Sequence, residues 1–236
     1  MITPSFAAAA VLAALPFVDA APLQARNATG CAPVHLLLAR GTTEGYPGTL
    51  GSLVDLVIDA VPGADYENII YPATDETSTE SYFEGRQAVA QQLSAYAGSC
   101  PESKIVFLAY SQGAMIVGDA LVGGGADPSG ILGNATQPLV SPQLGAHITA
   151  ISLYGDPRHV PFQPFDIGNG TFNAIGKYPR TSTQSTILET LYSHKIHDYC
   201  NNGDPVCASG DNIQAHLEYP QNWDTDAAAW LKSMVQ

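Results

Sequence analysis

The stretch from Ile105 to Val117 decides the fold, and it reads IVFLAYSQGAMIV. Its first part, which ends at Tyr110, is an unbroken apolar run of the length of a buried strand. The part after Ser111 holds Gln, Gly and then small and apolar residues that suit a buried helix. The stretch therefore predicts a strand that passes directly into a helix, with a serine at the turn.

Ser111 stands where a catalytic nucleophile stands in a strand–turn–helix elbow. Such a turn lifts the hydroxyl above the edge of the sheet and directs the first helical N–H groups toward developing negative charge. The usual pattern is G-x-S-x-G, and here Ala109 replaces the first glycine while Gly113 keeps the second. The alternative is a serine that only caps the helix, but the context of strand, serine and helix favours the nucleophile.

Apolar runs and helical patterns alternate along the rest of the chain. Strands are predicted at 34–39, 66–71, 105–110, 148–154 and 195–199. Helices are predicted at 50–61, 81–97, 112–121 and 222–234, and long loops at 123–143 and 162–183. This alternation predicts an α/β fold with a mostly parallel sheet, helices on both faces, and reactive groups at the carboxyl ends of the strands.

The composition is that of one globular domain. The chain has 236 residues, of which 45% are hydrophobic and 13% charged, and this suits a single α/β domain with a sizeable core. Its formal net charge of −13 repels nucleic acid, and no basic run offsets that charge. We therefore expect no nucleic-acid partner.

The first residues are predicted to be a signal peptide. Residues 6–18 form an Ala-rich apolar run that is too short to span a bilayer. Small residues suit cleavage after Ala20 or Ala21, although no Lys or Arg precedes the apolar run. No other apolar run is long enough for a membrane span, so we expect a secreted protein without a membrane anchor.

This interpretation divides the chain into three parts. They are a signal peptide at 1–20, a short extension at 21–30 and the folded domain at 31–236. Export would also allow glycans on the N-x-S/T sequons, which begin at Asn27, Asn134 and Asn169.

The cysteines agree with export. Their number, four, is even, and four cysteines allow three disulfide pairings. Cys200 and Cys207 are close in sequence and most simply close a small loop. That pairing leaves Cys31 with Cys100, which would tie the start of the domain to the end of a helix.

A serine nucleophile needs a histidine base and an acid that orients the histidine. In enzymes with this elbow the chain order is serine, acid, histidine. Asp204 lies between Cys200 and Cys207, whose disulfide would fix its carboxylate, and His216 alone of the six histidines follows it. We therefore predict Asp204 and His216 as acid and base. Competing acids are Asp156, Asp198 and Asp211.

The negative oxygen of the transition state needs hydrogen-bond donors. The backbone N–H of Gln112, directly after Ser111, is the first candidate. The second should come from the loop after the first strand, where Gly41 permits a tight turn and Thr42 offers an N–H and a hydroxyl. An ordinary polar turn is the alternative for this loop.

No metal or cofactor is expected. The cysteines lack the C-x-x-C spacing of zinc sites. His194 and His197 are three residues apart in a strand-like run, whereas zinc-binding histidines on a helix stand four apart. We therefore expect chemistry carried by side chains alone.

Several motifs occur together and in a fixed order. They are ARGTTE at 39–44, YSQG at 110–113, the cysteine loop around Asp204, and His216. On these motifs the chain resembles the fungal cutinases and acetylxylan esterases, from about Cys31 to the C-terminus. The resemblance implies a three-layer α/β/α sandwich of the α/β-hydrolase type with a central five-stranded parallel sheet. It also implies a Ser111, Asp204 and His216 triad, an oxyanion hole at Thr42 and Gln112, and no metal.

The substrate that the resemblance implies is an ester of a plant cell-wall polymer. GTLG at 48–51 is similar to cutinases, whereas GDP at 155–157 is similar to acetylxylan esterases. The segments expected to border the site, 74–79 and 208–215, are polar apart from Ile213. They offer a long acyl chain little apolar area, which slightly favours acetyl over cutin esters.

Other functions remain open at this stage. The main hypothesis is a secreted, monomeric serine esterase that forms an acyl-enzyme on Ser111. An inactive wall-binding effector is a second hypothesis, and the presence of all the triad candidates argues against it. An acyltransferase that uses the same acyl-enzyme is a third.

Overall fold

The computed structural model describes residues 30–236 apart from 75–78, 171 and 173. The predicted signal peptide, the Asn27 sequon and most of the polar segment 74–79 therefore lie outside the described residues. Within the part that is described, no helix is long and apolar enough to cross a membrane.

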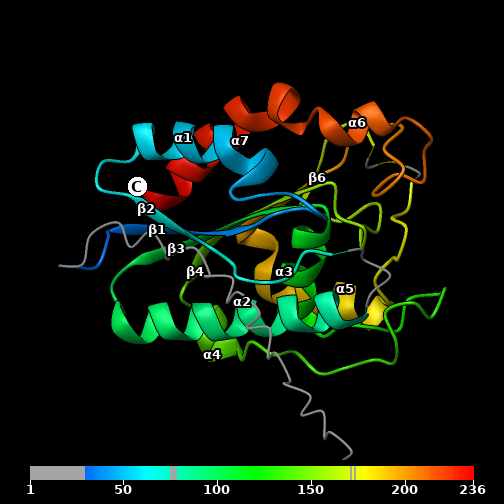
Figure 1. The fold of residues 1–236 in the computed structure, drawn as a ribbon, viewed down its shortest axis with the longest axis horizontal. Coiled ribbons are helices and arrows are strands. Elements are labelled where there is room, and N and C mark those ends of the chain that lie inside the picture. The colour runs from blue at the N-terminus through cyan, green and yellow to red at the C-terminus, as the bar shows by residue number, and fades with distance from the viewer. Residues whose placement is uncertain (1–29, 75–78, 171, 173) are drawn as a thin grey trace, which may run out of the picture.

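A parallel sheet forms the centre of the molecule (Figure 1). Its strand order is β2-β1-β3-β4-β6-β5, and all paired strands run parallel. The strands are β1 (Val34–Ala39), β2 (Asp65–Asn68), β3 (Lys104–Tyr110), β4 (Ile148–Tyr154), β5 (Asp166–Ile167) and β6 (Ile196–Tyr199). The sheet has six strands rather than the expected five, because β5 lies inside the predicted loop 162–183 and is too short to leave a hydrophobic pattern.

Helices cover both faces of the sheet, which gives the expected three layers (Figure 1). Helices α1 (Gly51–Ala60) and α7 (Tyr219–Val235) pack together on one face. The other face is covered by α2 (Thr79–Ser99), α3 (Gln112–Val122) and α5 (Ser182–Tyr192). Shorter elements are α4 (Pro142–Gly145), α6 (Ile213–Leu217) and the 3-10 turns η1 (Gly48–Leu50) and η2 (Ser193–Lys195).

Strand β3 shows why the deciding stretch is apolar throughout. Phe107 and Ala109 belong to the core beneath α2 and α3, whereas Val106 and Leu108 belong to the core beneath α1 and α7. All four side chains are completely buried. A parallel strand that is covered on both faces reads as a continuous hydrophobic run rather than an alternating one.

The predicted helices are present with shifted ends, and the sequence missed three others, α4, α5 and α6. Helix α5 has few apolar residues, but it begins at a capping box in which Thr181 and Gln184 exchange hydrogen bonds. Helix α6 lies where a loop was expected, so His216 is on a helix and not on a loop.

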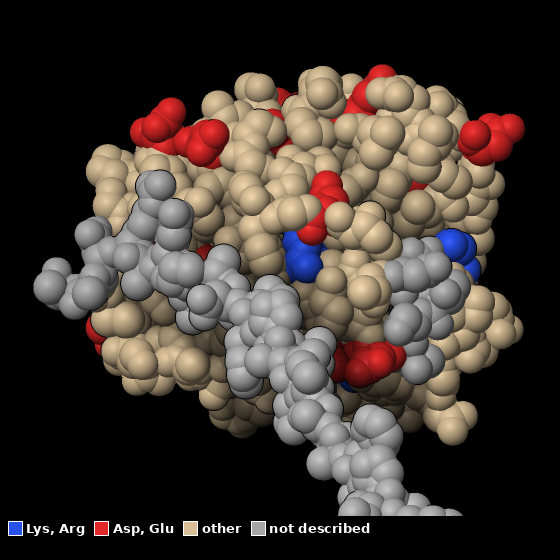
Figure 2. All heavy atoms as spheres, in the orientation of Figure 1, with Lys and Arg blue, Asp and Glu red and all other residues tan. Residues whose placement is uncertain are grey.

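Both favoured disulfides are present. Cys31 bonds to Cys100 at the end of α2, and Cys200 bonds to Cys207 across a separation of 7 residues. On the face of the molecule that Figure 2 shows, the areas of Lys and Arg are small and Asp and Glu are scattered over the surface.

Candidate active site

Ser111 lies at the junction of β3 and α3, at the carboxyl end of a central strand. Its φ of 54° and ψ of −119° lie in a region that non-glycine residues rarely adopt, and such strain clusters at functional sites. Its side chain makes no capping hydrogen bond to α3. The alternative in which Ser111 only caps the helix is therefore not realised, and the hydroxyl faces His216 instead.

Gly113 explains how the elbow can be so tight. A Cβ on Gly113 would lie 1.9 Å from the carbonyl oxygen of Ala39 at the end of β1. Ala109, by contrast, is fully buried in the sheet, so the methyl that replaces the usual glycine is accommodated. The N–H of Ser111 donates to the carbonyl of Tyr154 at 2.8 Å, which ties the turn to β4.

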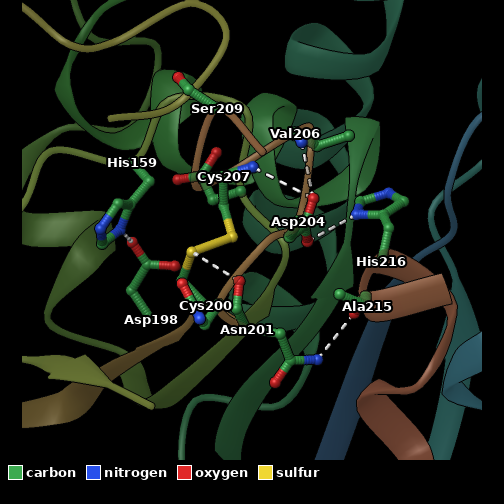
Figure 3. The surroundings of a disulfide bond; sticks show 12 residues. His159, Asp198, Cys200, Asn201, Asp204, Val206, Cys207, Ser209, Ala215 and His216 are labelled. Carbon is green, nitrogen blue, oxygen red and sulfur yellow. Dashed lines mark hydrogen bonds and ion pairs between the residues drawn. A yellow bond between two sulfur atoms is a disulfide. The ribbon is translucent and has the colours of Figure 1, made fainter. Parts of the chain in front are cut away.

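Hydrogen bonds connect Ser111 to Asp204 through His216. The Nε2 of His216 lies 3.0 Å from Ser111 Oγ. Its Nδ1 lies 2.8 Å from Asp204 Oδ2, a contact that Figure 3 shows. The residues come from β3, the cysteine loop and α6, whose first turn is capped by Asn212. This geometry lets the imidazole accept the serine proton while the carboxylate holds the ring in the required tautomer.

Asp204 is fully buried and accepts several hydrogen bonds. Its Oδ1 accepts from the N–H of Val206 at 2.6 Å and of Cys207 at 3.4 Å, and its Oδ2 accepts from the hydroxyl of Tyr219 at 2.7 Å. Burial by itself would raise the pKa of Asp204, but the hydrogen bonds and charge of His216 and the hydroxyl of Tyr219 hold it below its usual value. The carboxylate is therefore ionised at neutral pH.

Two tyrosines that sequence reasoning missed surround the imidazole. Tyr110 stacks on the His216 ring with centroids 5.0 Å apart, and its hydroxyl donates to the His216 carbonyl at 2.9 Å. Tyr219 donates to Asp204 and accepts from the N–H of Asn201 at 3.1 Å. Burial raises the pKa of both phenols, so they stay neutral donors. Their closeness in sequence to predicted site residues was the available signal.

The competing acids have other partners. Asp198 lies 2.8 Å from His159, Asp156 accepts from Arg180 at 2.6 Å, and Asp211 is exposed. None of these three pairs with His216, so Asp204 is the acid that the fold brings to the imidazole.

His194 and His197, the two histidines considered as metal ligands, do not form a metal site with each other. His197 stacks on Trp230, and His194 is exposed. Among the described residues, the one group with atoms close enough to hold a metal ion is His159, Asp166 and Asp198. This group includes neither His194 nor His197.

Thr42 and Gln112, the two residues predicted to form the oxyanion hole, are in contact through their side chains. The side-chain Nε2 of Gln112 donates to Thr42 Oγ1 at 3.3 Å and to the carbonyl of Thr74 at 2.7 Å, and its Oε1 accepts from Ser81 at 2.9 Å. Gln112 is also the first residue of α3, so its backbone N–H has no helical acceptor. The N–H of Gln112 thus follows Ser111 directly, and the Gln112 side chain holds the hydroxyl of Thr42 next to it.

Glu44 holds the loop that carries Thr42. Its carboxylate accepts from the N–H of Gly41 at 2.7 Å and from the N–H of Thr49 at 3.0 Å. The Nε of Arg40 in turn donates to the Glu44 carbonyl at 2.6 Å. The loop is therefore a braced structure rather than an ordinary polar turn.

The rim is more apolar than the sequence suggested. Ile213 and Leu217 flank His216 on α6 and are 60% and 50% exposed. Ile175 is 46% exposed and contacts the predicted border segment 208–215, because its carbonyl accepts from the hydroxyl of Ser209. The sequence analysis missed Leu217 because it lies beyond the segment 208–215, and it missed Ile175 because it lies in the loop 162–183.

Comparisons with known proteins agree on one family. A family model described as Cutinase matches residues 30–235. An acetylxylan esterase of Hypocrea jecorina is 33% identical over 214 residues, which cover 87% of this chain and 68% of that protein. Cutinase 11 of Verticillium dahliae is 33% identical over 236 residues, which cover 96% of this chain and 76% of the relative.

Solved structures give the same result. The catalytic core domain of an acetyl xylan esterase from Trichoderma reesei superposes with a TM-score of 0.75 at 30% identity, covering 87% of this chain and 100% of that one. A Trichoderma reesei cutinase in complex with a phosphonate inhibitor superposes with a TM-score of 0.59 at 24% identity, over 87% of this chain and 78% of that one. At that identity the second likeness supports the fold alone.

Proposed function

Because the chain belongs to the cutinase family, we propose that it is a serine carboxylic-ester hydrolase acting on esters of plant cell-wall polymers. The observation that carries this proposal is the hydrogen-bonded series Ser111, His216, Asp204 at the carboxyl end of the sheet.

The first half-reaction forms an acyl-enzyme. His216 Nε2 takes the hydroxyl proton of Ser111 as Oγ attacks the ester carbonyl. The carbonyl oxygen becomes an oxyanion and accepts from the N–H of Gln112 and from Thr42. The intermediate collapses when His216 gives the proton to the alcohol oxygen, which leaves.

The second half-reaction restores the enzyme. Water gives a proton to His216 Nε2 and attacks the acyl carbonyl, and a second oxyanion forms in the same place. Collapse returns the proton to Ser111 Oγ and releases the carboxylic acid. Asp204 remains ionised throughout, because its hydrogen bonds favour the carboxylate.

For the acyl group we propose a short chain, with acetylated xylan as the substrate. Two of the relatives described above carry the name acetylxylan esterase or its core domain. The apolar rim beside His216 consists of separate side chains, and each buried CH₂ of a fatty chain gains only about 0.8 kcal/mol. Cutin is the second candidate, supported by the cutinase relative and by the exposed Ile213 and Leu217.

Hydrolysis of p-nitrophenyl esters with two to sixteen carbons tests this proposal, with Ser111→Ala as control. A sharp preference for acetyl, together with acetate release from acetylated xylan, would support the short-acyl assignment. A rate that peaks at four or more carbons would support cutin instead. Activity no higher than that of Ser111→Ala at any length would favour the wall-binding effector, and ester formation with an alcohol acceptor would favour the acyltransferase.

We further propose that the protein is exported as a monomer after cleavage of residues 1–20. Two disulfides fit an oxidising compartment. The sequon residues Asn134 and Asn169 are exposed and could accept glycans. Intact mass and N-terminal sequencing of the secreted protein, before and after deglycosylation, test cleavage and glycosylation, and size-exclusion chromatography with light scattering tests the monomeric state.

A further inference from the structure

We propose that His159, Asp166 and Asp198 form a binding site for one divalent transition-metal cation with a structural role. The site is independent of the proposed function. Figure 3 shows His159 and Asp198 on one side of the Cys200–Cys207 disulfide, with Asp204 and His216 on the other.

The sheet brings the three side chains together. Asp166 on β5 and Asp198 on β6 are direct partners in the parallel register, so their carboxylates share one face. His159 comes from the turn after β4, and its Nδ1 lies 2.8 Å from Asp198 Oδ2 and 3.9 Å from Asp166 Oδ1. One ligand atom from each residue lies within 4.8 Å of the others.

The site is buried and its hydrogen bonding is incomplete. The side chains of His159, Asp198 and Asp166 are 0%, 3% and 4% exposed. The Oδ1 atoms of Asp166 and Asp198 have no hydrogen-bond partner among the described residues, and the Asp166 Oδ1 faces His159. A buried carboxylate oxygen without a donor is costly, and a cation would remove that cost.

The surrounding charges do not compensate the two carboxylates. The nearby guanidinium of Arg158 pairs with Asp119 at 3.1 Å, and that of Arg180 pairs with Asp156 at 2.6 Å. The charge of Arg180 also acts on Asp166 and Asp198, but its hydrogen bond goes to Asp156. The imidazole of His159 is the cationic group in contact with the two carboxylates, and even when charged it leaves one negative charge in excess among the three side chains. A divalent cation with a neutral imidazole would make the site neutral.

The protonation of Asp166 agrees with this charge count. Burial, followed by the charge of Asp198, raises the pKa of Asp166 to about 7, although His159 opposes the shift. Metal binding would release protons to solvent, since the ligands must be deprotonated.

The donor set selects the class of cation. One imidazole nitrogen and two carboxylate oxygens suit Zn²⁺, Co²⁺ or Mn²⁺, whereas Ca²⁺ needs six to eight oxygens and Mg²⁺ prefers oxygen alone. With tetrahedral zinc bonds of about 2.0–2.2 Å, His159 Nδ1 and Asp198 Oδ2, now 2.8 Å apart, would separate slightly, and Asp166 Oδ1, now 3.9 Å from Nδ1, would move closer, with water in the remaining position.

The position of the site predicts its role. Asp198 lies two residues before Cys200, so a cation there would anchor the end of β6, from which the loop carrying Asp204 begins. No ligand atom of the site belongs to the series Ser111, His216, Asp204. The cation would therefore stabilise the base of the active site without taking part in catalysis.

Titration calorimetry of the chelator-treated mature protein with ZnCl₂ tests the proposal, with Asp166→Asn as the variant. The matched control is Asp65→Asn, because Asp65 also pairs with a buried histidine, His35 at 2.7 Å, but lies near the surface. We expect one site in the wild type and in Asp65→Asn. In Asp166→Asn, affinity should fall at least as much as the roughly 10–100-fold that loss of an outer-shell partner costs.

Two further measurements remain informative if Asp166→Asn does not fold. His159→Gln removes the nitrogen ligand and should abolish the visible absorption of bound Co²⁺. Anomalous scattering from a crystal of the wild type soaked in ZnCl₂ should place the ion between the three side chains. Failure of the wild type to bind Zn²⁺ or Co²⁺, an ion located elsewhere, or equal binding by Asp166→Asn and Asp65→Asn would overturn the proposal.

Discussion

The hydroxyl of Tyr219 donates a hydrogen bond to Asp204 Oδ2 at 2.7 Å, and the Nδ1 of His216 is hydrogen-bonded to the same oxygen. One carboxylate oxygen thus holds a helix-borne imidazole and a phenol from the first turn of α7. Because the phenol is neutral and buried, it stabilises the ionised carboxylate without competing for the role of base.

Tyr219→Phe should destabilise the fold in a pH-dependent way. The pKa of Asp204 is depressed in the folded state, so its stabilisation is present above the unfolded pKa and is lost as pH falls through the folded value. We expect a loss of about 1.5–3 kcal/mol near pH 7, typical of a hydrogen bond to a charged group, and a smaller loss near pH 3. Urea unfolding at both pH values measures the difference.

The remaining loss at low pH would come from the N–H of Asn201, which also loses its partner. Tyr154→Phe is the matched control, because the Tyr154 hydroxyl donates to Asp224 at 3.0 Å and has no hydrogen bond to a triad candidate, while the backbone contact of Tyr154 with Ser111 is kept. That variant should lose stability and keep its kcat. An equal loss for Tyr219→Phe at both pH values would mean that the hydroxyl does not act on the charged form of Asp204.

Asp204→Asn should lower kcat for p-nitrophenyl acetate by about 10⁴, because an amide leaves the imidazole in the wrong tautomer. Asp211→Asn, in the same region but exposed, should leave kcat unchanged. If the two variants lost activity equally, Asp204 would not be the orienting acid. Circular dichroism of both proteins would separate this result from unfolding.

The elbow could be predicted from sequence because its determinants are local. The apolar run before Ser111 and the small residues after it encode a strand and a helix, and Gly113 is required by contact with Ala39. Chain order left His216 as the base, and the position of Asp204 between Cys200 and Cys207 selected it over the competing acids, which also precede His216.

Other features depend on contacts that no local pattern encodes. Strand β5 exists only because Asp166 and Ile167 pair with β6, and the meeting of Asp166, Asp198 and His159 follows from that register. The contacts of Tyr219 depend on how α7 begins against the cysteine loop. Sequence periodicity reports which face of an element is buried, but it does not report which polar atoms meet there.

Thr42→Val should lower kcat by about 10²–10³, the usual cost of one oxyanion donor, with little change in KM. Because Gln112 Nε2 holds Thr42 Oγ1 at 3.3 Å, Gln112→Met should cause a smaller loss through misplacement of that hydroxyl. Thr43→Ala, in the same loop with an exposed side chain, is the control and should behave as wild type.

The double variant of Thr42 and Gln112 separates the two effects. If Gln112 acts through the Thr42 hydroxyl, the two losses will not add, and the double variant will be no slower than Thr42→Val alone. Fully additive losses would show that the Gln112 side chain contributes independently of Thr42.

The Cys31–Cys100 disulfide should matter more for stability, and the Cys200–Cys207 disulfide should matter more for activity. The Cys31–Cys100 bond spans 69 residues and the Cys200–Cys207 bond spans 7. Chain entropy predicts that replacing the first pair by serine costs about 4 kcal/mol and replacing the second about 2.5 kcal/mol. The short loop, however, carries Asp204, so its removal should lower kcat, whereas removal of the long-range bond should leave kcat unchanged. Urea unfolding and p-nitrophenyl acetate hydrolysis on both variants test the crossover, and a loss of activity that simply followed stability would contradict it.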